Sequence, residues 1–225
     1  MSGKLIIIEG SDGSGKQTQA ERLYSRLKAE DYRVQKVDYP DYQSESSALI
    51  RMYLGGQFGN DPDAVNAYAA SAFYAVDRYA SYKRKWQEFY YNGGIVIADR
   101  YTTSNMVYQA VKLVSQQEKE SFLQWLWDLE FNKFALPVPD AVYFLDMPPA
   151  YFRRLIDERA GKTAGKQDIH ECNQDYLVNC YNSYHNIAAK YGWHKINCVN
   201  GELLKSIDEI HAEVYKSVMD TVINR

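Results

Sequence analysis

The stretch LIIIEGSDGSGKQTQAERL (residues 5–23) joins an apolar run to a glycine-rich loop and then to a helical pattern. The apolar run is typical of a buried strand. The loop GSDGSGK (residues 10–16) satisfies the GxxxxGK pattern, in which backbone N–H groups and a helix N-terminus surround phosphate oxygens. The following helix is predicted to end near Glu30, and its sheet-facing residues are Ala20, Leu23, Tyr24 and Leu27.

Lys16 is the cation of this loop, and in such a motif it reaches the β and γ phosphates of ATP. Phosphate oxygens repel a nearby carboxylate, so we expect Asp12 to point away from ATP. Gln17 replaces the usual Mg²⁺-binding Ser or Thr, and the hydroxyl of Thr18 lies about 100° further around the helix. The Gln17 amide oxygen can still accept a cation or orient a water, so we expect Mg²⁺-dependent phosphoryl transfer. ATP contacts are predicted for Gly10, Ser11, Asp12, Gly13, Ser14, Gly15, Lys16, Gln17 and Thr18.

Short apolar runs alternate with helical patterns along the whole chain, which is typical of a parallel sheet. The runs are KLIIIEG (4–10), YRVQKVDYP (32–40), GIVIADR (94–100), DAVYFLDMP (140–148) and HKINCVNG (194–201). Residues 60–94 predict one long helix that opens at Asp61 and Pro62 and stops at two glycines. A second long helix is predicted over 115–136, and a last one begins at Ser206. No linker divides the chain, so we predict a single doubly wound domain over residues 1–225.

The stretch ERAGKTAGKQDIHE (158–171) lies between helical patterns and has little apolar content. It predicts a mobile lid over about 159–171. Closure of such a lid would bring cations onto a transferring phosphoryl group and exclude water, although by itself the segment is a solvated run of charge. The cations in and just before the lid are Arg153, Arg154, Arg159, Lys162 and Lys166.

The composition is that of a soluble globular protein, with 46% hydrophobic and 24% charged residues in 225. A net charge of -3 provides no basic field for a nucleic-acid polymer. Cys172, Cys180 and Cys198 show no CxxC pairing, so neither a disulfide framework nor a zinc site is expected, and His170 lacks further ligands. Without a signal peptide or an apolar run of membrane-spanning length, we expect a cytoplasmic protein.

Asp99 and Arg100 end an apolar strand, and ligands bind at the carboxyl ends of strands in open α/β sheets. Asp99 could hold Mg²⁺, and Arg100 could clamp an acceptor phosphate with its forked guanidinium. The alternative is a structural Asp–Arg pair. Tyr74 and Arg78 share a helix face and would suit a nucleobase, although this spacing also fits a core contact beside a surface charge.

These motifs together resemble the thymidylate kinase family of P-loop nucleoside monophosphate kinases. Residues 6–23 are similar to the first signature of that family, DRYTTSNMVYQ (99–109) to its second, and AFYAVDR (72–78) to its base-binding segment. The resemblance implies a three-layer, doubly wound sheet of five parallel strands of the P-loop NTP hydrolase type. It also implies a homodimer and transfer of the ATP γ-phosphate to dTMP, which gives dTDP and ADP.

Carried over position by position, the resemblance implies catalytic roles for Lys16, Asp12, Arg100 and Arg159. Asp12 would hold the acceptor sugar, Arg100 the acceptor phosphate, and Tyr74 and Arg78 the base. Ser104, Tyr108 and Gln109 would lie near the base and sugar. The family places a charge-stabilising Arg either in the loop or in the lid, and because Gly13 follows Asp12 the lid would supply it, with Arg159 assisted by Lys162 and Lys166.

The sequence departs from the family at the acceptor side. The segment DYPDYQSES (38–46) lacks the Arg that many members place after this proline, and Tyr42 stands near that position. Tyr74 occupies a position where Phe is common. Two alternatives therefore stay open: a kinase of another deoxynucleotide or deoxynucleoside, and a catalytically weak ATP-binding protein.

Overall fold

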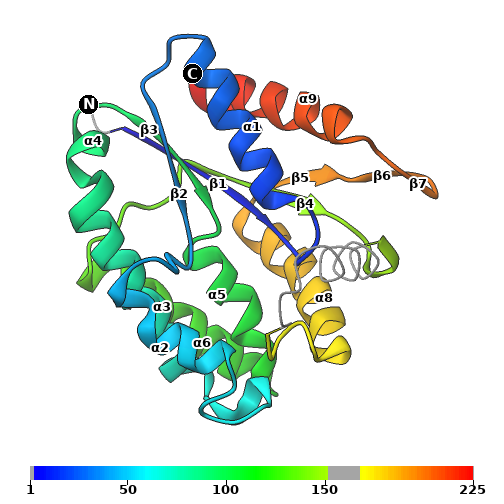
Figure 1. The fold of residues 1–225 in the computed structure, drawn as a ribbon. Helices are drawn as coiled ribbons and strands as arrows, with labels where there is room; N and C mark the ends of the chain where they lie inside the picture. Colours follow the sequence, from blue (N-terminus) through cyan, green and yellow to red (C-terminus); the bar gives the residue numbers. More distant parts are fainter. Residues whose placement is uncertain (1–2, 152–167, 225) are drawn as a thin grey trace.

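The computed structural model describes residues 3–151 and 168–224, and its centre is a sheet of five parallel strands (Figure 1). The strand order is β2-β3-β1-β4-β5. The strands are β1 (Lys4–Gly10), β2 (Val34–Asp38), β3 (Ile95–Asp99), β4 (Ala141–Asp146) and β5 (His194–Asn197). The predicted fold class, a doubly wound sheet of five parallel strands, is confirmed.

Alternation along β1 gives the sheet two apolar faces, because successive side chains of a strand point to opposite sides. Ile6 and Ile8 pack in one core with residues of α1 (Lys16–Ala29) and α9 (Ile207–Val218). Leu5 and Ile7 pack in another core with Tyr82, Trp86 and Tyr90. Helices therefore cover both faces and form the three layers visible in Figure 1.

The long helix predicted over 60–94 is present, but it begins later than expected. It consists of α3 (Ala67–Ser81), a π-helical segment η3 (Tyr82–Trp86) and α4 (Gln87–Tyr91). Asn66 caps it, its side-chain oxygen accepting the Ala69 N–H at 2.9 Å. The predicted start at Asp61 and Pro62 is wrong, because these residues lead into a separate 3-10 turn (Pro62–Ala64) and Val65 is extended.

The second predicted helix appears as α6 (Gln116–Trp127) followed by the π-helical segment η5 (Asp128–Lys133). The run 194–201 is not one strand: it splits into β5 and β6 (Val199–Asn200), which pairs antiparallel with β7 (Leu203–Leu204). The remaining elements are η1 (Glu45–Ser47), α2 (Ala48–Leu54), α5 (Thr102–Tyr108), η4 (Ala110–Lys112), α8 (Gln174–Tyr191) and η6 (Met219–Ile223).

Register brings the two sequence motifs together at one edge of the sheet. Ile8 of β1 lies opposite Asp99 of β3, so the loop after β1 and the Asp99–Arg100 turn leave the sheet side by side. This is the carboxyl edge, where open α/β sheets bind ligands. In residues 3–151 and 168–224, no helix has the length and apolar character needed to cross a membrane.

Candidate active site

The loop after β1 has the geometry of a phosphate cradle. Gly13 and Gly15 adopt left-handed φ angles of 80° and 83°, which L side chains rarely adopt. A Cβ at Gly10 would lie 2.6 Å from Ser14 Oγ, so the backbone there has no room for a side chain. The buried hydroxyls of Ser11 and Ser14 have no hydrogen-bond partner in the described residues. Such unpaired groups beside a helix N-terminus fit an anion such as phosphate.

Lys16 folds over this loop and is 7% exposed. Its ammonium donates to the Ser11 carbonyl at 2.8 Å and lies 3.7 Å from an Asp12 carboxylate oxygen. Burial, reinforced by the nearby Arg100 charge, lowers the pKa of Lys16 to about 8, against the opposing effect of Asp12 and Asp99. This cation is therefore only partly compensated, and polyphosphate oxygens would complete its environment.

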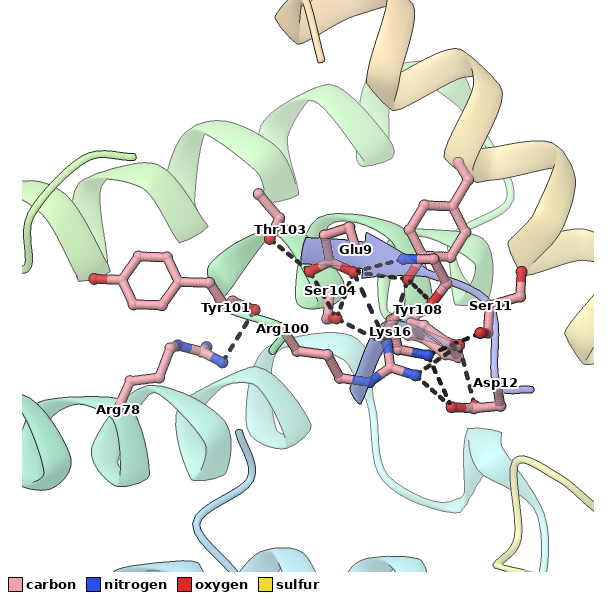
Figure 2. A network of polar contacts seen from close by, with 12 residues as sticks. Glu9, Ser11, Asp12, Lys16, Arg78, Arg100, Tyr101, Thr103, Ser104 and Tyr108 are labelled. Carbon is pink, nitrogen blue, oxygen red and sulfur yellow. Dashed lines mark hydrogen bonds and ion pairs between the residues drawn. The ribbon is translucent and has the colours of Figure 1, made fainter. Parts of the chain in front are cut away.

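Arg100 extends from the end of β3 into the centre of the site (Figure 2). Its backbone has a φ of 67°, a left-handed conformation that costs a non-glycine residue about 1 kcal/mol or more. The guanidinium forms an ion pair with Asp12 and donates to Ser104 Oγ at 3.0 Å. Burial alone would lower the pKa of Arg100, but Asp12 and its other neighbours hold it well above the ordinary value.

Asp12 points toward Arg100 and accepts a hydrogen bond from the Tyr108 hydroxyl at 3.1 Å. Burial would raise the pKa of this carboxyl, but Arg100 and Lys16 together lower it well below its usual range. Asp12 is therefore a stable anion between the two cations.

Glu9 organises the residues around Arg100, a role that the sequence did not predict. This buried carboxylate accepts hydrogen bonds from Thr103 at 2.6 Å, Ser104 at 2.9 Å and the Tyr184 hydroxyl at 2.9 Å. Figure 2 shows Thr103 and Ser104 directed toward Glu9 at the end of β1. The available signal was a carboxylate at the end of an otherwise apolar strand, since a buried charge requires partners.

Asp99 is a partly buried carboxylate that could hold a metal ion. Its Oδ1 atom is buried and has no hydrogen-bond partner in the described residues. Burial raises the pKa of Asp99, against the opposing effect of Lys16 and Arg100. Hard cations such as Mg²⁺ prefer carboxylate oxygens, so Asp99 fits the metal that ATP carries.

A large cavity of about 1380 Å³ opens over the loop. Its lining includes Lys16, Gln17, Thr18 and Asp99, and at one end Ile207 and other residues that follow β7. A volume of this size exceeds what one drug-sized ligand needs, so it has room for more than a nucleotide triphosphate.

A second, smaller cavity adjoins it and contains the predicted acceptor residues. Its lining includes Tyr74, Arg78, Ser104, Tyr108 and Gln109. Asp12, Tyr42 and Arg100 line both cavities, so the two meet at the ion pair between Asp12 and Arg100. The predicted residues from α3 and α5 are therefore brought together from segments distant in sequence.

Three polar residues of the second cavity, Asn105, Asp168 and His170, were not predicted as site residues from the sequence. Asn105 has a buried side-chain nitrogen without a partner, and the neighbouring Gln109 has a buried, unpaired side-chain oxygen. Asp168 lines both cavities, and burial together with the charge of Asp12 raises its pKa to about 6. His170 is buried there and lies 2.8 Å from the Tyr53 hydroxyl, and burial lowers its pKa to about 3. Only tertiary packing places these residues beside α3.

The lid cations Arg153, Arg154, Arg159, Lys162 and Lys166 lie outside the described residues.

A phosphate-binding loop at the carboxyl edge of a parallel sheet, with cations and a buried carboxylate beside it, defines a P-loop phosphotransferase. A family model for thymidylate kinase matches residues 8–214. The chain belongs to the thymidylate kinase family, which confirms the resemblance described above.

Two relatives illustrate the similarity. The probable thymidylate kinase of Thermococcus onnurineus is 31% identical over 222 residues, which cover 98% of this chain and 99% of the relative. The thymidylate kinase of Mycobacterium tuberculosis is 30% identical over 191 residues, with 84% and 87% coverage. The solved structure of thymidylate kinase from Candida albicans has the same fold, with a TM-score of 0.71, 22% identity and coverage of 97% of this chain and 92% of that chain.

Proposed function

We propose that the protein transfers the γ-phosphate of ATP to dTMP, giving dTDP and ADP. The observation that carries this proposal is the meeting of the two cavities at Asp12 and Arg100. A donor nucleotide in the large cavity and an acceptor in the small one would direct their phosphates toward this junction. Family membership supports the same reaction.

The large cavity is the proposed donor site. The loop and first helical turn, residues 10–18, would surround the ATP phosphates, with Lys16 on the β and γ phosphates. Mg²⁺, held by Asp99, ATP oxygens and water, would neutralise charge on the phosphate oxygens. Gln17 and Thr18 are exposed at the same opening and could orient its waters.

The smaller cavity is the proposed acceptor site. Arg100 would hold the acceptor phosphate, and Asp12 would accept a hydrogen bond from the sugar. Tyr74 would stack on the base, while Ser104 and Tyr108 would lie near the sugar. Burial raises the pKa of Tyr74 well above its ordinary value, so its phenol stays neutral beside the base.

Base selectivity follows from the unpaired groups in this cavity. Arg78 and the Asn105 nitrogen offer hydrogen-bond donors, whereas the Gln109 oxygen is an acceptor. Thymine presents carbonyl oxygens and an N–H on its polar edge, which complement this set. Cytosine replaces one carbonyl with an amino group and would leave a donor facing a donor, a mismatch that buried sites reject strongly.

Catalysis in this arrangement is electrostatic and needs no covalent intermediate. Lys16, Arg100 and the bound metal would neutralise the two anions so that they can approach in line. From the sequence, Arg159 is proposed to stabilise the transferred phosphoryl group. Retained kcat in Arg159→Ala, alongside lost activity in Lys16→Ala, would remove Arg159 from the mechanism.

We also propose that the protein is a homodimer joined through α3. The outward face of this helix carries Tyr68, Val76 and Tyr79, which are 39%, 51% and 40% exposed. Its two charged residues, Asp77 and Arg78, are both buried, so the exposed face has no charged side chain. Such an apolar stripe is typical of an interface, and a second copy would cover it.

ADP release from Mg-ATP would test the reaction directly, with dTMP, dUMP, dCMP, dGMP, dAMP, UMP and thymidine as acceptors and a control without acceptor. We expect clear preference for dTMP. Preference for another acceptor would overturn the acceptor assignment, whereas no turnover on any acceptor would overturn the proposed function itself.

A further inference from the structure

Glu130 is a fully buried carboxylate that lines neither of the two cavities described above. It belongs to the π-helical segment η5 at the end of α6. Its carboxylate accepts hydrogen bonds from Arg78 Nε at 2.7 Å and from Thr102 Oγ1 at 2.6 Å, and its other oxygen pairs with Arg78 Nη2. We infer that Glu130 is a positioning residue for base recognition, which it controls by fixing the orientation of Arg78.

Stability alone does not account for this pair. Arg78 is 1% exposed and Glu130 is 0% exposed, so both charges have lost their hydration. Replacing a buried ion pair with apolar residues of similar volume is often neutral or stabilising. Burial alone would lower the pKa of Arg78, but Glu130 reverses this effect and raises it, so the two charges compensate one another in the folded protein.

The geometry of the pair decides which N–H groups of Arg78 remain for a ligand. A guanidinium has five N–H donors in a fixed plane, and the side-on contact with Glu130 uses Nε–H and one N–H of Nη2. The Nη1 group makes only a long contact, 3.5 Å, to the Tyr101 carbonyl, and Figure 2 shows the side chain directed there. Since Arg78 lines the smaller cavity, the N–H groups of Nη1 and the second N–H of Nη2 are the donors left for an acceptor base.

The ion pair between Arg78 and Glu130 also gives the base site a different net charge from the phosphate site. With Glu130 in place, Arg78 presents N–H donors without net charge, which suits the carbonyl of a neutral base. Arg100 lies apart from Arg78, beside Asp12, and both Arg100 and Asp12 line the donor cavity as well (Figure 2). An uncompensated Arg78 would be a second cation able to attract the acceptor phosphate to the wrong end.

Thr102 connects this pair to the phosphate end of the site. It is the first residue of α5, and the next two residues, Thr103 and Ser104, donate to Glu9. Side chains of the short segment 100–104 therefore contact both buried glutamates, and the same segment carries Arg100. This arrangement fixes the separation between the base donor and the phosphate clamp.

The test rests on the proposed function and compares the ratio of kcat/KM for dTMP to that for dCMP in the full-length protein. In Glu130→Gln we expect this ratio to fall at least about tenfold, about 1.4 kcal/mol, through a higher KM for dTMP with little change in kcat. Glu120→Gln makes the same chemical change at an exposed position of α6 and should leave the ratio unchanged.

A double-mutant cycle separates positioning from general destabilisation. If Glu130 acts through Arg78, Arg78→Leu and the double variant Arg78→Leu with Glu130→Leu should have the same low ratio. A Glu130→Gln protein with a lower melting temperature but an unchanged ratio would overturn the inference. If Glu130→Gln does not fold, Glu130→Asp can be used in its place, because it keeps the carboxylate on a side chain that is one methylene shorter. An unchanged ratio of dTMP to dCMP in Glu130→Asp would also overturn the inference. Absence of turnover on every acceptor in the wild-type protein would instead contradict the proposed function.

Discussion

The charged side chains at the junction of the two cavities have pKa values that depend on their partners. Lys16, Asp12 and Arg100 form a chain of alternating charge, cation, anion and cation, at the meeting of the two cavities. Asp12 raises the pKa of Arg100, whereas burial lowers the pKa of Lys16 and makes it easier to deprotonate than an ordinary lysine. Lys16 is proposed to bind ATP as a cation, so the pH dependence of ATP binding should report on its protonation.

We predict that ATP affinity falls as pH rises above about 8, because Lys16 loses its proton near that value rather than near its ordinary 10.5. Calorimetric titration of ATP from neutral pH to about pH 10 would measure this. Lys16→Arg is the control, since an arginine stays protonated throughout and its binding should not show the same decline. An affinity for the wild-type protein that is constant to about pH 10 would contradict the prediction.

Asp99→Asn is predicted to raise the Mg²⁺ concentration needed for half-maximal activity at least about tenfold, because a neutral amide binds a hard cation weakly. The pKa of Asp99 is raised in the folded state, so its ionised form costs stability at neutral pH. The variant should therefore melt at a higher temperature without nucleotide. The exposed Asp175→Asn should change neither quantity, and unaltered Mg²⁺ dependence in Asp99→Asn would remove Asp99 from the metal site.

Gln17→Thr is predicted to change kcat by less than about tenfold, or about 1.4 kcal/mol, because the hydroxyl is one metal contact among several. Steady-state rates at saturating Mg-ATP would measure the effect. A larger gain in rate would mean that the natural glutamine compromises the metal site.

Among the elements, the turn between β1 and α1 depends most on backbone geometry. Gly10 has a φ of 152°, and a Cβ there would lie 2.6 Å from Ser14 Oγ and 2.9 Å from the Leu145 carbonyl. The loop must therefore move, or β4 must, before any side chain is accommodated. The same turn presents the phosphate-binding N–H groups, so stability and ATP affinity are coupled at this residue.

Gly10→Ala is predicted to lower the free energy of unfolding by about 2 kcal/mol or more and to weaken ATP binding. Gly192, the C-cap of α8, is the matched control: its φ is 66°, but a Cβ there would meet nothing within 4 Å. Gly192→Ala should cost only about 1 kcal/mol and leave ATP affinity unchanged. Urea unfolding and ATP titration of both variants would check this, and equal behaviour would refute the steric argument.

At the scale of the whole molecule, two proposed functions fall on opposite sides of α3. Its inner side contributes Tyr74 and Arg78 to the smaller cavity, proposed as the acceptor site, and its outer side presents the apolar stripe proposed as the dimer interface. Association would therefore cover the helix proposed to recognise the base.

Val76→Lys is predicted to convert dimers to monomers, because an unpaired ammonium would be buried in the apolar interface. Light scattering coupled to size-exclusion chromatography would measure the mass. Val138→Lys is the control, since Val138 is comparably exposed, 48% against 51%, but lies outside α3. A wild-type protein that elutes as a monomer, or a Val76→Lys variant that remains dimeric, would rule out this interface.

Local pattern in the sequence determined the phosphate-binding loop, the alternation of strands and helices, and the membership of Asp99 and Arg100 in the site. These features depend on where glycines stand and on how apolar residues repeat over a few positions, so they can be predicted from the sequence alone. The start of α3 was misplaced because two capping candidates, Asp61 and Asn66, compete locally, and packing selects between them.

Only the tertiary structure decided which charged and polar side chains meet. Glu130 and Arg78 are 52 positions apart, Glu9 and Tyr184 are 175 apart, and the Arg100 guanidinium reaches an Asp12 that is 88 positions away. Periodicity contains no information about such pairs, since the pairing follows from strand order and register, and the burial of each carboxylate makes a partner obligatory. The sequence by itself thus determined the phosphate-binding loop, and the fold decided which side chains surround the smaller cavity beside it.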